Sequence, residues 1–531
     1  MVNGAPKYQP VLWTLLPCAV VLCLAAWLRG AEYDEQYTLF LTAGVPRPAW
    51  PAAVFPAGLA RVLQSGDAGI GTIARDLRVT DVHPPLYFWL VALWRASLGH
   101  GLFVARLLSV LLGLVALGLT GLIARTARVP VVWAMALTVG CYGFAYTSMV
   151  ARGFALAQVL LLGGVVGLIL GRRWWHFALA GALFGAATMS NYLALFTAGA
   201  CLLAFSLEAI WSGPRRNRPP RAVLAPPDAG PSATLPHIGG ENTHPRDAPL
   251  FGHVLAALCG FLVFIPGDLW WFLAQRDSRQ GQFPPFSMAG SVARLAIRFT
   301  GDILGGLPLY VHGLASLVVT GALGLLVLWS VFRVVWRWRL IGTPPARTMF
   351  ALAALAPGVG LLLLGMLFNN TPIEVRYLTF STPFVGLLLA GALGPWCRAV
   401  VLAVQAASIA GLMLAPQTMQ PARAAARAAS ALVRDGVVLL PRGNDGVGVV
   451  GAFAIEASPA LPLLLIPAGA TPEQIRARLD SWHRVVLALI EQDDASRAAG
   501  DAMRRAMADP AWREVAHGPN VAVYERVAGG I

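Results

Sequence analysis

Acidic and basic residues lie next to the ends of long apolar runs in this sequence. Asp34 and Glu35 stand together in AEYDEQYTLF, directly after the first apolar run. An ionisable residue at the middle of a membrane helix costs roughly 2.5–3.5 kcal/mol on insertion scales, so residues of this kind near a bilayer indicate function. The polar set consists of Asp34, Glu35, Asp81, His83, Arg106, Arg152, Asn191, Tyr192, Glu374, Arg376 and Tyr377.

This set fits the transfer of a group from a lipid phosphate. An acceptor hydroxyl needs a carboxylate to take its proton. The leaving phosphate is already an anion, so cationic or amide donors stabilise it and a general acid is not required. A glycosidase needs two carboxyl groups that flank the scissile bond, and adjacent residues such as Asp34 and Glu35 are poor candidates for that arrangement. The pair therefore favours transfer over hydrolysis.

Each of these residues also has a purely structural interpretation. Asp34 and Glu35 could form a solvated cluster after a helix, and the arginines could be interfacial anchors that reach lipid headgroups. His83 precedes two prolines and could be a capping or turn residue. The predicted gathering of all these residues on one side of a membrane favours the functional interpretation.

The elements that must position these residues are membrane helices. Of the 531 residues, 57% are hydrophobic and 12% are charged, and the mean hydropathy of +0.64 exceeds what a soluble domain of this length could bury. The net charge of +14 comes from arginines in short clusters between apolar runs, which indicates membrane topology and not nucleic-acid binding. All six cysteines lie in apolar stretches without a CxxC pair, so no disulfide framework or zinc site is predicted.

The sequence predicts about eleven transmembrane helices, because each crossing requires roughly 20 apolar residues. The first, 11–28, is interpreted as an uncleaved span and not as a signal peptide. The stretch 83–99 is short, proline-led and aromatic, and we expect an interfacial or re-entrant helix there, within a first outer loop of 29–101. The other predicted spans are 102–124, 129–148, 153–171, 174–190, 192–212, 250–274, 305–333, 347–368, 377–395 and 397–415.

The basic loops set the predicted orientation. With the N-terminus in the cytoplasm, the Arg-rich loops all lie inside, as the positive-inside rule requires. Counting 83–99 as a span would move several of them outside. The loops predicted inside are 125–128, 171–175, 214–221, 333–339 and the turn at Arg398. Those predicted outside are 29–101, 149–152, the turn at Asn191, 275–304, 369–376 and everything after about 416.

Two segments differ in composition from the rest of the predicted membrane domain, 1–415. The loop 213–249 is rich in Pro, Gly and Arg, which predicts a disordered cytoplasmic loop. Residues 416–531 resemble a small soluble domain in which apolar β-like runs alternate with helical stretches, a pattern typical of an extracytoplasmic α/β domain. No GxGxxG follows its strands, so no nucleotide site is indicated. The predicted strands are 437–441, 461–467, 484–490 and 521–527.

The order of the motifs resembles that of a known family. DE after the first span, HPPLY at 83–87, RLLSVLLG at the start of the next span, then ARGFAL and a late RYL are similar to the protein O-mannosyltransferase and aminoarabinose-transferase group of the glycosyltransferase-C superfamily. The resemblance covers roughly 10–415, and bacterial members append a periplasmic α/β tail. It implies the glycosyltransferase-C fold.

The resemblance also implies roles for single residues. Asp34 would be the catalytic base, and Glu35 would support it or help to bind a divalent metal ion. Arg152 and Arg376 would bind the donor phosphate, with His83 at the position where relatives hold His or Lys before the proline. Gly-Phe follows Arg152 where many relatives have an aromatic residue closer to the arginine. The further candidates are Arg106 for the phosphate, and Tyr37, Tyr87, Asn191, Tyr192 and Tyr377 elsewhere in the site.

The predicted function is that of a membrane glycosyltransferase. It would move a hexosyl or pentosyl group from a polyprenyl-phosphate donor to a hydroxyl of a lipid, protein or glycan, by a single displacement with inversion. The site and the tail would face the periplasm from a bacterial inner membrane, with no nucleic-acid partner. One alternative is a transporter or flippase of lipid-linked sugars, although the sequence shows neither paired halves nor charges at span centres. Another is a non-catalytic assembly protein or receptor whose tail binds a partner.

Overall fold

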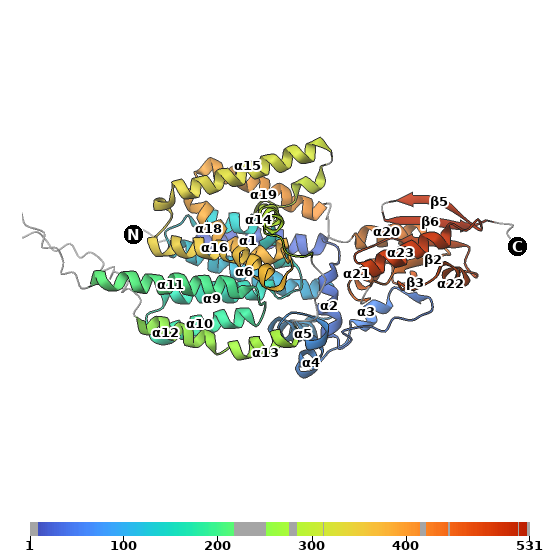
Figure 1. Cartoon of the computed structure of the whole chain (residues 1–531), viewed down its shortest axis with the longest axis horizontal. Helices are drawn as coiled ribbons and strands as arrows, with labels where there is room; N and C mark the ends of the chain where they lie inside the picture. The colour runs from blue at the N-terminus through green and yellow to red at the C-terminus, as the bar shows by residue number, and fades with distance from the viewer. Residues whose placement is uncertain are drawn as a thin grey trace, which may run out of the picture.

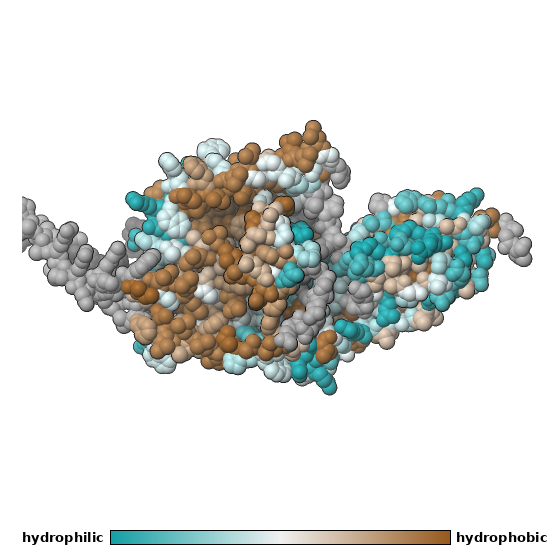
Figure 2. Space-filling model, in the orientation of Figure 1, coloured by the Kyte–Doolittle hydropathy of each residue, from teal (hydrophilic) through white to brown (hydrophobic). Residues whose placement is uncertain are grey.

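A computed structural model describes residues 9–216, 251–275, 284–311, 313–414, 421–443, 446–518 and 520–527. A large helical body and a smaller unit built on a β-sheet lie at opposite ends of the molecule (Figure 1). Hydrophobic residues cover much of the visible face of the body, whereas the sheet unit is mostly hydrophilic there (Figure 2). The predicted fold class, a polytopic helical membrane protein with a small C-terminal α/β unit, is confirmed.

The helical body is built from long apolar helices. Its first half contains α1 (Gln9–Leu28), α6 (Leu102–Thr126), α7 (Val131–Gly140), α8 (Tyr142–Met149), α9 (Phe154–Leu170), α10 (Trp174–Thr188) and α11 (Ala194–Arg216). Its second half contains α12 (Phe251–Leu262), α13 (Ile265–Gln275), α14 (Met288–Leu304), α15 (Leu314–Trp336), α16 (Pro344–Phe368), α17 (Val375–Leu378), α18 (Thr382–Ala392) and α19 (Pro395–Leu414). Short 3-10 turns η2 (Leu307–Tyr310), η3 (Trp338–Leu340) and η4 (Thr379–Ser381) interrupt the second half.

Six helical stretches of the described residues are long and apolar enough to cross a membrane, or seven if the bent pair α7 and α8 is one span. The remaining predicted spans correspond to shorter apolar helices, such as α9 and the apolar part of α19. The number of eleven therefore stays a prediction. The predicted loop 213–249 lies outside the described residues, apart from 213–216, which belong to α11.

Two segments of the helical body have structure that the sequence analysis did not anticipate. The stretch 275–304 was expected to be an outer loop, but its second part forms α14, which begins at the N-cap Ser287, where the hydroxyl accepts a hydrogen bond from Gly290 N. Charged residues interrupt its apolar pattern, so a search for apolar runs misses it. The predicted span 129–148 is not continuous either, because α7 and α8 meet at an angle of 71° next to Cys141.

The loop 29–101, between α1 and α6, folds into several small elements, of which α2 lies between the body and the sheet unit (Figure 1). They are α2 (Tyr33–Thr42), β1 (Phe55–Pro56), α3 (Leu59–Leu63), α4 (Ile70–Thr80) and α5 (Leu86–Leu98). The helix expected within 83–99 is present as α5. The short strand β1 pairs antiparallel with a strand of the C-terminal unit, so this loop and the far end of the chain form one sheet.

The C-terminal unit is an α/β sheet with the strand order β1-β3-β2-β4-β6-β5. Its elements are α20 (Ala422–Leu432), β2 (Val437–Pro441), α21 (Gly448–Glu456), β3 (Pro462–Ile466), α22 (Pro472–Ala477), β4 (Arg484–Ala488), α23 (Asp494–Met507), β5 (Trp512–Gly518) and β6 (Val521–Arg526). Strands β3, β2 and β4 are parallel, and β6 and β5 extend the sheet antiparallel.

Alternate residues of the central strands pack on opposite faces of this sheet. Val438 and Leu440 pack with α20 and α21, whereas Val437 and Leu439 pack with α22 and α23. Strands buried on both faces read as continuous apolar runs, which is why β2, β3, β4 and β6 were predictable. β5 was missed because its sequence, WREVAHG, is mostly polar and exposed.

Candidate active site

The acidic pair lies in the first turn of α2, and its two carboxylates have different surroundings. Glu35 Oε2 accepts a hydrogen bond from Glu32 N at 3.0 Å, an arrangement that caps the start of the helix. The Glu35 side chain is completely buried, whereas 14% of the Asp34 side chain remains exposed. Adjacent positions on a helix face different directions, so only Asp34 is open to a ligand.

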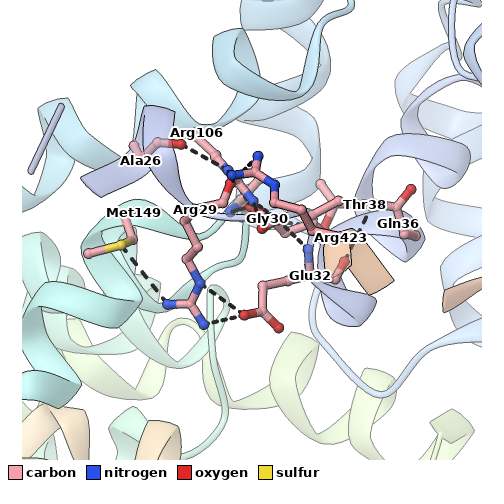
Figure 3. A network of polar contacts seen from close by, with 12 residues as sticks. Ala26, Arg29, Gly30, Glu32, Gln36, Thr38, Arg106, Met149 and Arg423 are labelled. Atoms are coloured by element: carbon pink, nitrogen blue, oxygen red, sulfur yellow. Dashed lines mark hydrogen bonds and ion pairs between the residues drawn. The ribbon is translucent and has the colours of Figure 1, made fainter. Parts of the chain in front are cut away.

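Glu35 forms a buried ion pair with Arg106 of α6. Arg106 Nε donates to Glu35 Oε1 at 2.8 Å and Nη2 donates to Oε2 at 2.6 Å, and Ala151 N also donates to Oε1 at 3.1 Å. The other Arg106 donors bind the carbonyl oxygens of Ala26, Arg29 and Gly30 at the end of α1 (Figure 3).

A guanidinium has five N–H groups, and this arrangement occupies all of those of Arg106. Arg106 thus has no N–H group left for a phosphate, in contrast to its predicted role. The geometry favours a structural role for Arg106 and Glu35, which together hold α2 against the ends of α1 and α6.

Asp34 faces two other arginines from distant parts of the chain. Arg376 of α17 forms an ion pair with Asp34 Oδ2, and Arg152, between α8 and α9, places Nη2 4.0 Å from Oδ1. Arg152 is buried, whereas 19% of the Arg376 side chain is exposed. The structure therefore brings together the predicted carboxylate and both cations that the family resemblance assigned to the phosphate.

Arg152 is held by the two polar residues around HPPLY. Its Nη1 donates to Asp81 Oδ2 at 2.8 Å, and His83 Nδ1 lies 2.9 Å from Asp81 Oδ1 and 3.3 Å from Arg152 Nη2. Asp81 and His83 are both buried. Asp34, Arg152, Asp81 and His83 thus form a continuous cluster of polar contacts, in which Arg152 lies between Asp34 on one side and Asp81 and His83 on the other.

A cavity of about 620 Å³ lies between α8, α14, α15 and α17, and its lining includes Arg376, the ion-pair partner of Asp34. Arg376 lines it together with two cations that the sequence analysis did not single out, Arg29 and Arg298. Its remaining lining is mainly small or apolar and consists of Tyr142, Tyr146, Ala296, Ile297, Thr300, Gly301, Gly305, Gly306, Pro308, Thr320, Leu323, Gly324, Glu374 and Val375. The cavity combines the cationic groups of Arg29, Arg298 and Arg376 with walls that suit a hydrocarbon chain.

The cavity cations have anionic or aromatic neighbours. Arg29 pairs with Glu32, its guanidinium lies 4.2 Å from the centre of the Tyr146 ring, and it also contacts Met149 (Figure 3). Arg298 Nη2 lies 3.7 Å from a carboxylate oxygen of Glu374. Arg29 follows the first span directly, so the search for ionisable residues near span ends, which found Asp34, could also have found Arg29. Arg298 was missed because its helix was expected to be a loop.

The aromatic and amide candidates each contact other side chains or backbone groups. Among them, the Tyr377 ring lies 5.3 Å from the Arg376 guanidinium. The hydroxyl of Tyr192 donates to Gln275 Oε1 at 3.0 Å, and Gln275 Nε2 in turn donates to the carbonyl of His83 at 3.1 Å. The other contacts are Tyr37 with the hydroxyl of Tyr33, Tyr87 with Ser109 Oγ at 3.0 Å, and Asn191 Oδ1 with Leu193 N at 3.1 Å.

The donor atoms around Asp34 and Glu35 do not suit a divalent cation. Within the described ranges, no three His, Cys, Asp or Glu side chains gather into a group that could hold a metal ion. Both oxygens of Glu35 already accept N–H donors, and Asp34 faces the guanidinium groups of Arg152 and Arg376, which repel a cation. The predicted metal role of this pair is therefore not compatible with the arrangement.

No protein-family model matches the sequence, and no curated protein matches it. Among solved structures, the chain is similar to ArnT from Cupriavidus metallidurans in the apo state, with a TM-score of 0.50 and 12% identity over 99% of each chain. It is also similar to the same protein bound to undecaprenyl phosphate, with a TM-score of 0.49 and 12% identity over 98% of this chain and 99% of ArnT.

A third similar structure is the archaeal oligosaccharyltransferase AglB from Archaeoglobus fulgidus in complex with an inhibitory peptide and a dolichol-phosphate. Its TM-score is 0.40 with 11% identity, over 91% of this chain and 70% of AglB. At these identities the comparison concerns the fold. The similarity to apo ArnT over nearly the whole chain shows that this multi-pass membrane protein shares the overall fold of ArnT.

Proposed function

We propose that this protein is a membrane glycosyltransferase that transfers a sugar from a polyprenyl-phosphate donor to an acceptor hydroxyl, with Asp34 as the catalytic base. One observation carries the proposal. The partly exposed carboxylate of Asp34 forms an ion pair with Arg376, which lines an otherwise largely apolar cavity together with Arg29 and Arg298. A lipid phosphate needs both a cationic end and an apolar channel, and this cavity offers both.

The cations suit the leaving group of the reaction. As the bond between the anomeric carbon and the phosphate oxygen breaks, the polyprenyl phosphate keeps the electron pair and its negative charge increases. Arg376 and Arg298 are the partly exposed cations of the cavity, and charge-assisted hydrogen bonds from them would stabilise that charge. A phosphate bound there would compete with Asp34 for Arg376, so donor binding would free the carboxylate.

The freed carboxylate suits the other half of the reaction. The acceptor oxygen attacks the anomeric carbon from the face opposite the phosphate, its proton passes to Asp34, and the new glycosidic bond forms with inversion. Arg152, fixed by Asp81 and His83, would keep Asp34 oriented during this step. The remaining buried pair, Glu35 and Arg106, would hold α2 in place.

The proposed function also implies the domain boundaries, the orientation in the membrane and the class of acceptor. The membrane domain would comprise 1–415, with 29–101 as the catalytic outer loop, and 416–531 would form the extracytoplasmic unit. The active site and this unit would face the periplasm of a bacterial inner membrane. The acceptor would be a lipid, protein or glycan hydroxyl, and the sugar a hexose or pentose.

The test is sugar transfer in inverted and right-side-out membrane vesicles supplied with radiolabelled polyprenyl-phosphate sugars, beginning with undecaprenyl carriers. Wild type is compared with Asp34→Asn, and with Asp67→Asn as a matched control in the same loop, where the side chain is 57% exposed and lies near His100. We expect transfer by wild type and the control, and loss of transfer with retained donor binding in Asp34→Asn. Equal transfer by all three would remove Asp34 from the mechanism.

A flippase of lipid-linked sugars is the second candidate, and one observation favours it. The helix break between α7 and α8 is of the kind that transporters use near the membrane midplane, and buried Asp302 packs against Gly143 beside it. The vesicle assay separates the two functions. Movement of the carrier across the bilayer without any glycosidic product would replace the transferase proposal with the flippase.

A further inference from the structure

The C-terminal unit forms hydrogen bonds with the turn that joins α1 to α2. From α20, Arg423 donates to the carbonyl oxygens of Leu28 and Arg29, the latter at 3.0 Å (Figure 3). Its Nε donates to Glu456 Oε2 at 2.8 Å, and Glu456 Oε1 accepts a hydrogen bond from Ala31 N at 2.6 Å. One ion pair of the C-terminal unit therefore binds both carbonyl and N–H groups of this turn.

Helix α21 of the same unit packs directly on α2. A Cβ atom at Gly448 would collide with the ring of Tyr33, and one at Gly451 would lie 2.8 Å from Gln36 Oε1 and from a ring atom of Phe40. Both glycines thus allow a close approach of the two helices, for which any side chain is too large. Glu456 is the last residue of α21. The ion pair of Arg423 with Glu456 and the close contact at Gly448 and Gly451 therefore belong to the same surface of the C-terminal unit.

The first turn of α2 is consequently fixed from two sides. The helical body holds it through Glu35 and Arg106, and the C-terminal unit holds the residues just before it, Leu28, Arg29 and Ala31, through Arg423 and Glu456. Asp34 lies in this turn, and its carboxylate faces the cavity cation Arg376. The chain that leads into this turn is thus in contact with a residue almost 400 positions further along the sequence.

We propose that Arg423 and Glu456 are positioning residues, through which the C-terminal unit sets the place of the Asp34 carboxylate next to the cavity cation Arg376. This inference rests on the proposed role of Asp34 as the base. Neither residue would touch the substrate. A displacement of about 1 Å at a catalytic group can cost roughly a hundredfold in rate, so a contact that fixes the turn can control turnover from outside the site.

The test compares Arg423→Ala, Glu456→Ala and the double variant in the full-length protein in vesicles. Arg427→Ala is the matched control, because Arg427 is exposed one turn further along α20. We expect kcat to fall about ten- to a hundredfold in both single variants, with an unchanged donor KM. The double variant should be no worse than the poorer single variant, since the two residues act as one unit. Glu456→Gln retains an acceptor for Ala31 N and should restore part of kcat.

A second readout does not depend on catalysis. Hydrogen exchange of the amides of residues 30–36 should become faster in Arg423→Ala and Glu456→Ala than in wild type and Arg427→Ala, while exchange in the sheet stays the same. Unchanged kcat together with unchanged exchange would overturn the proposal. A parallel loss of kcat, donor binding and exchange protection throughout the C-terminal unit would also overturn it, because Arg423 and Glu456 would then only stabilise the fold. If wild type transfers no sugar, the proposed function fails, and the exchange data alone decide whether the pair fixes this turn.

Discussion

At the residue scale, the neighbouring carboxylates of Glu35 and Asp34 have different roles, one structural and one catalytic. Substitutions that affect them should therefore change the stability of the protein to different extents. Arg106→Ala leaves the fully buried Glu35 carboxylate without its partner, and breaking a buried pair in this way costs about 3–5 kcal/mol. Asp34→Asn affects a partly exposed group and should leave stability close to that of wild type. Thermal unfolding in detergent measures both. A melting temperature of Arg106→Ala equal to that of wild type would contradict the structural role of the pair.

The sequence predicted the members of the site better than their individual roles. Asp34, Arg152 and Arg376 were found because they are ionisable residues close to the predicted spans, and the structure brings these three together. The difference between Asp34 and Glu35 could not be predicted, because it depends on which side of α2 meets Arg106 from another helix. Local sequence does not contain that information.

At the scale of elements, α10 and α12 meet through glycines where their backbones nearly touch. A Cβ atom at Gly181 would collide with the carbonyl of Ala257, and one at Gly260 with the carbonyl of Ala178. Small residues permit this approach between membrane helices. Gly260→Ala should therefore destabilise the protein by about 1–3 kcal/mol through overpacking.

The control for this prediction is Gly199→Ala in α11, where nothing lies within 4 Å of an added Cβ atom. The stability of this variant should equal or slightly exceed that of wild type, because alanine is more favourable than glycine within a helix. Denaturation of purified protein in detergent measures both variants. Equal stability of Gly260→Ala and Gly199→Ala would show that the close crossing of α10 and α12 is not required.

Helices and strands were predicted correctly where a run of apolar residues is continuous, and they were missed where polar residues interrupt the run. Apolar runs gave the long helices and the buried strands β2, β3, β4 and β6. Helix α14 was missed because Arg294, Arg298 and Asp302 interrupt its apolar residues. Strand β1 was missed for another reason, since only its partner β3, about 400 residues further along the chain, makes it a strand.

At the scale of the whole molecule, the cavity joins helices from both halves of the body, and it should bind a polyprenyl phosphate. A ligand that binds only the folded state stabilises it, by about 2.7 kcal/mol at a hundred times its dissociation constant. Undecaprenyl phosphate should thus raise the melting temperature of wild type, and inorganic phosphate should raise it less, because the apolar walls would then contribute nothing.

Gly324 of α15 offers the sharpest test of this cavity, because it lines the space and no atom lies within 4 Å of an added Cβ atom. Gly324→Leu should therefore fold normally while its side chain fills the cavity, which lowers the stabilisation by undecaprenyl phosphate and raises the donor KM. Gly321→Leu is the matched control on the same helix, also with open space around it but outside the cavity lining. If both variants respond to the lipid as wild type does, the polyprenyl chain does not occupy this cavity, and the donor must approach Asp34 from another side.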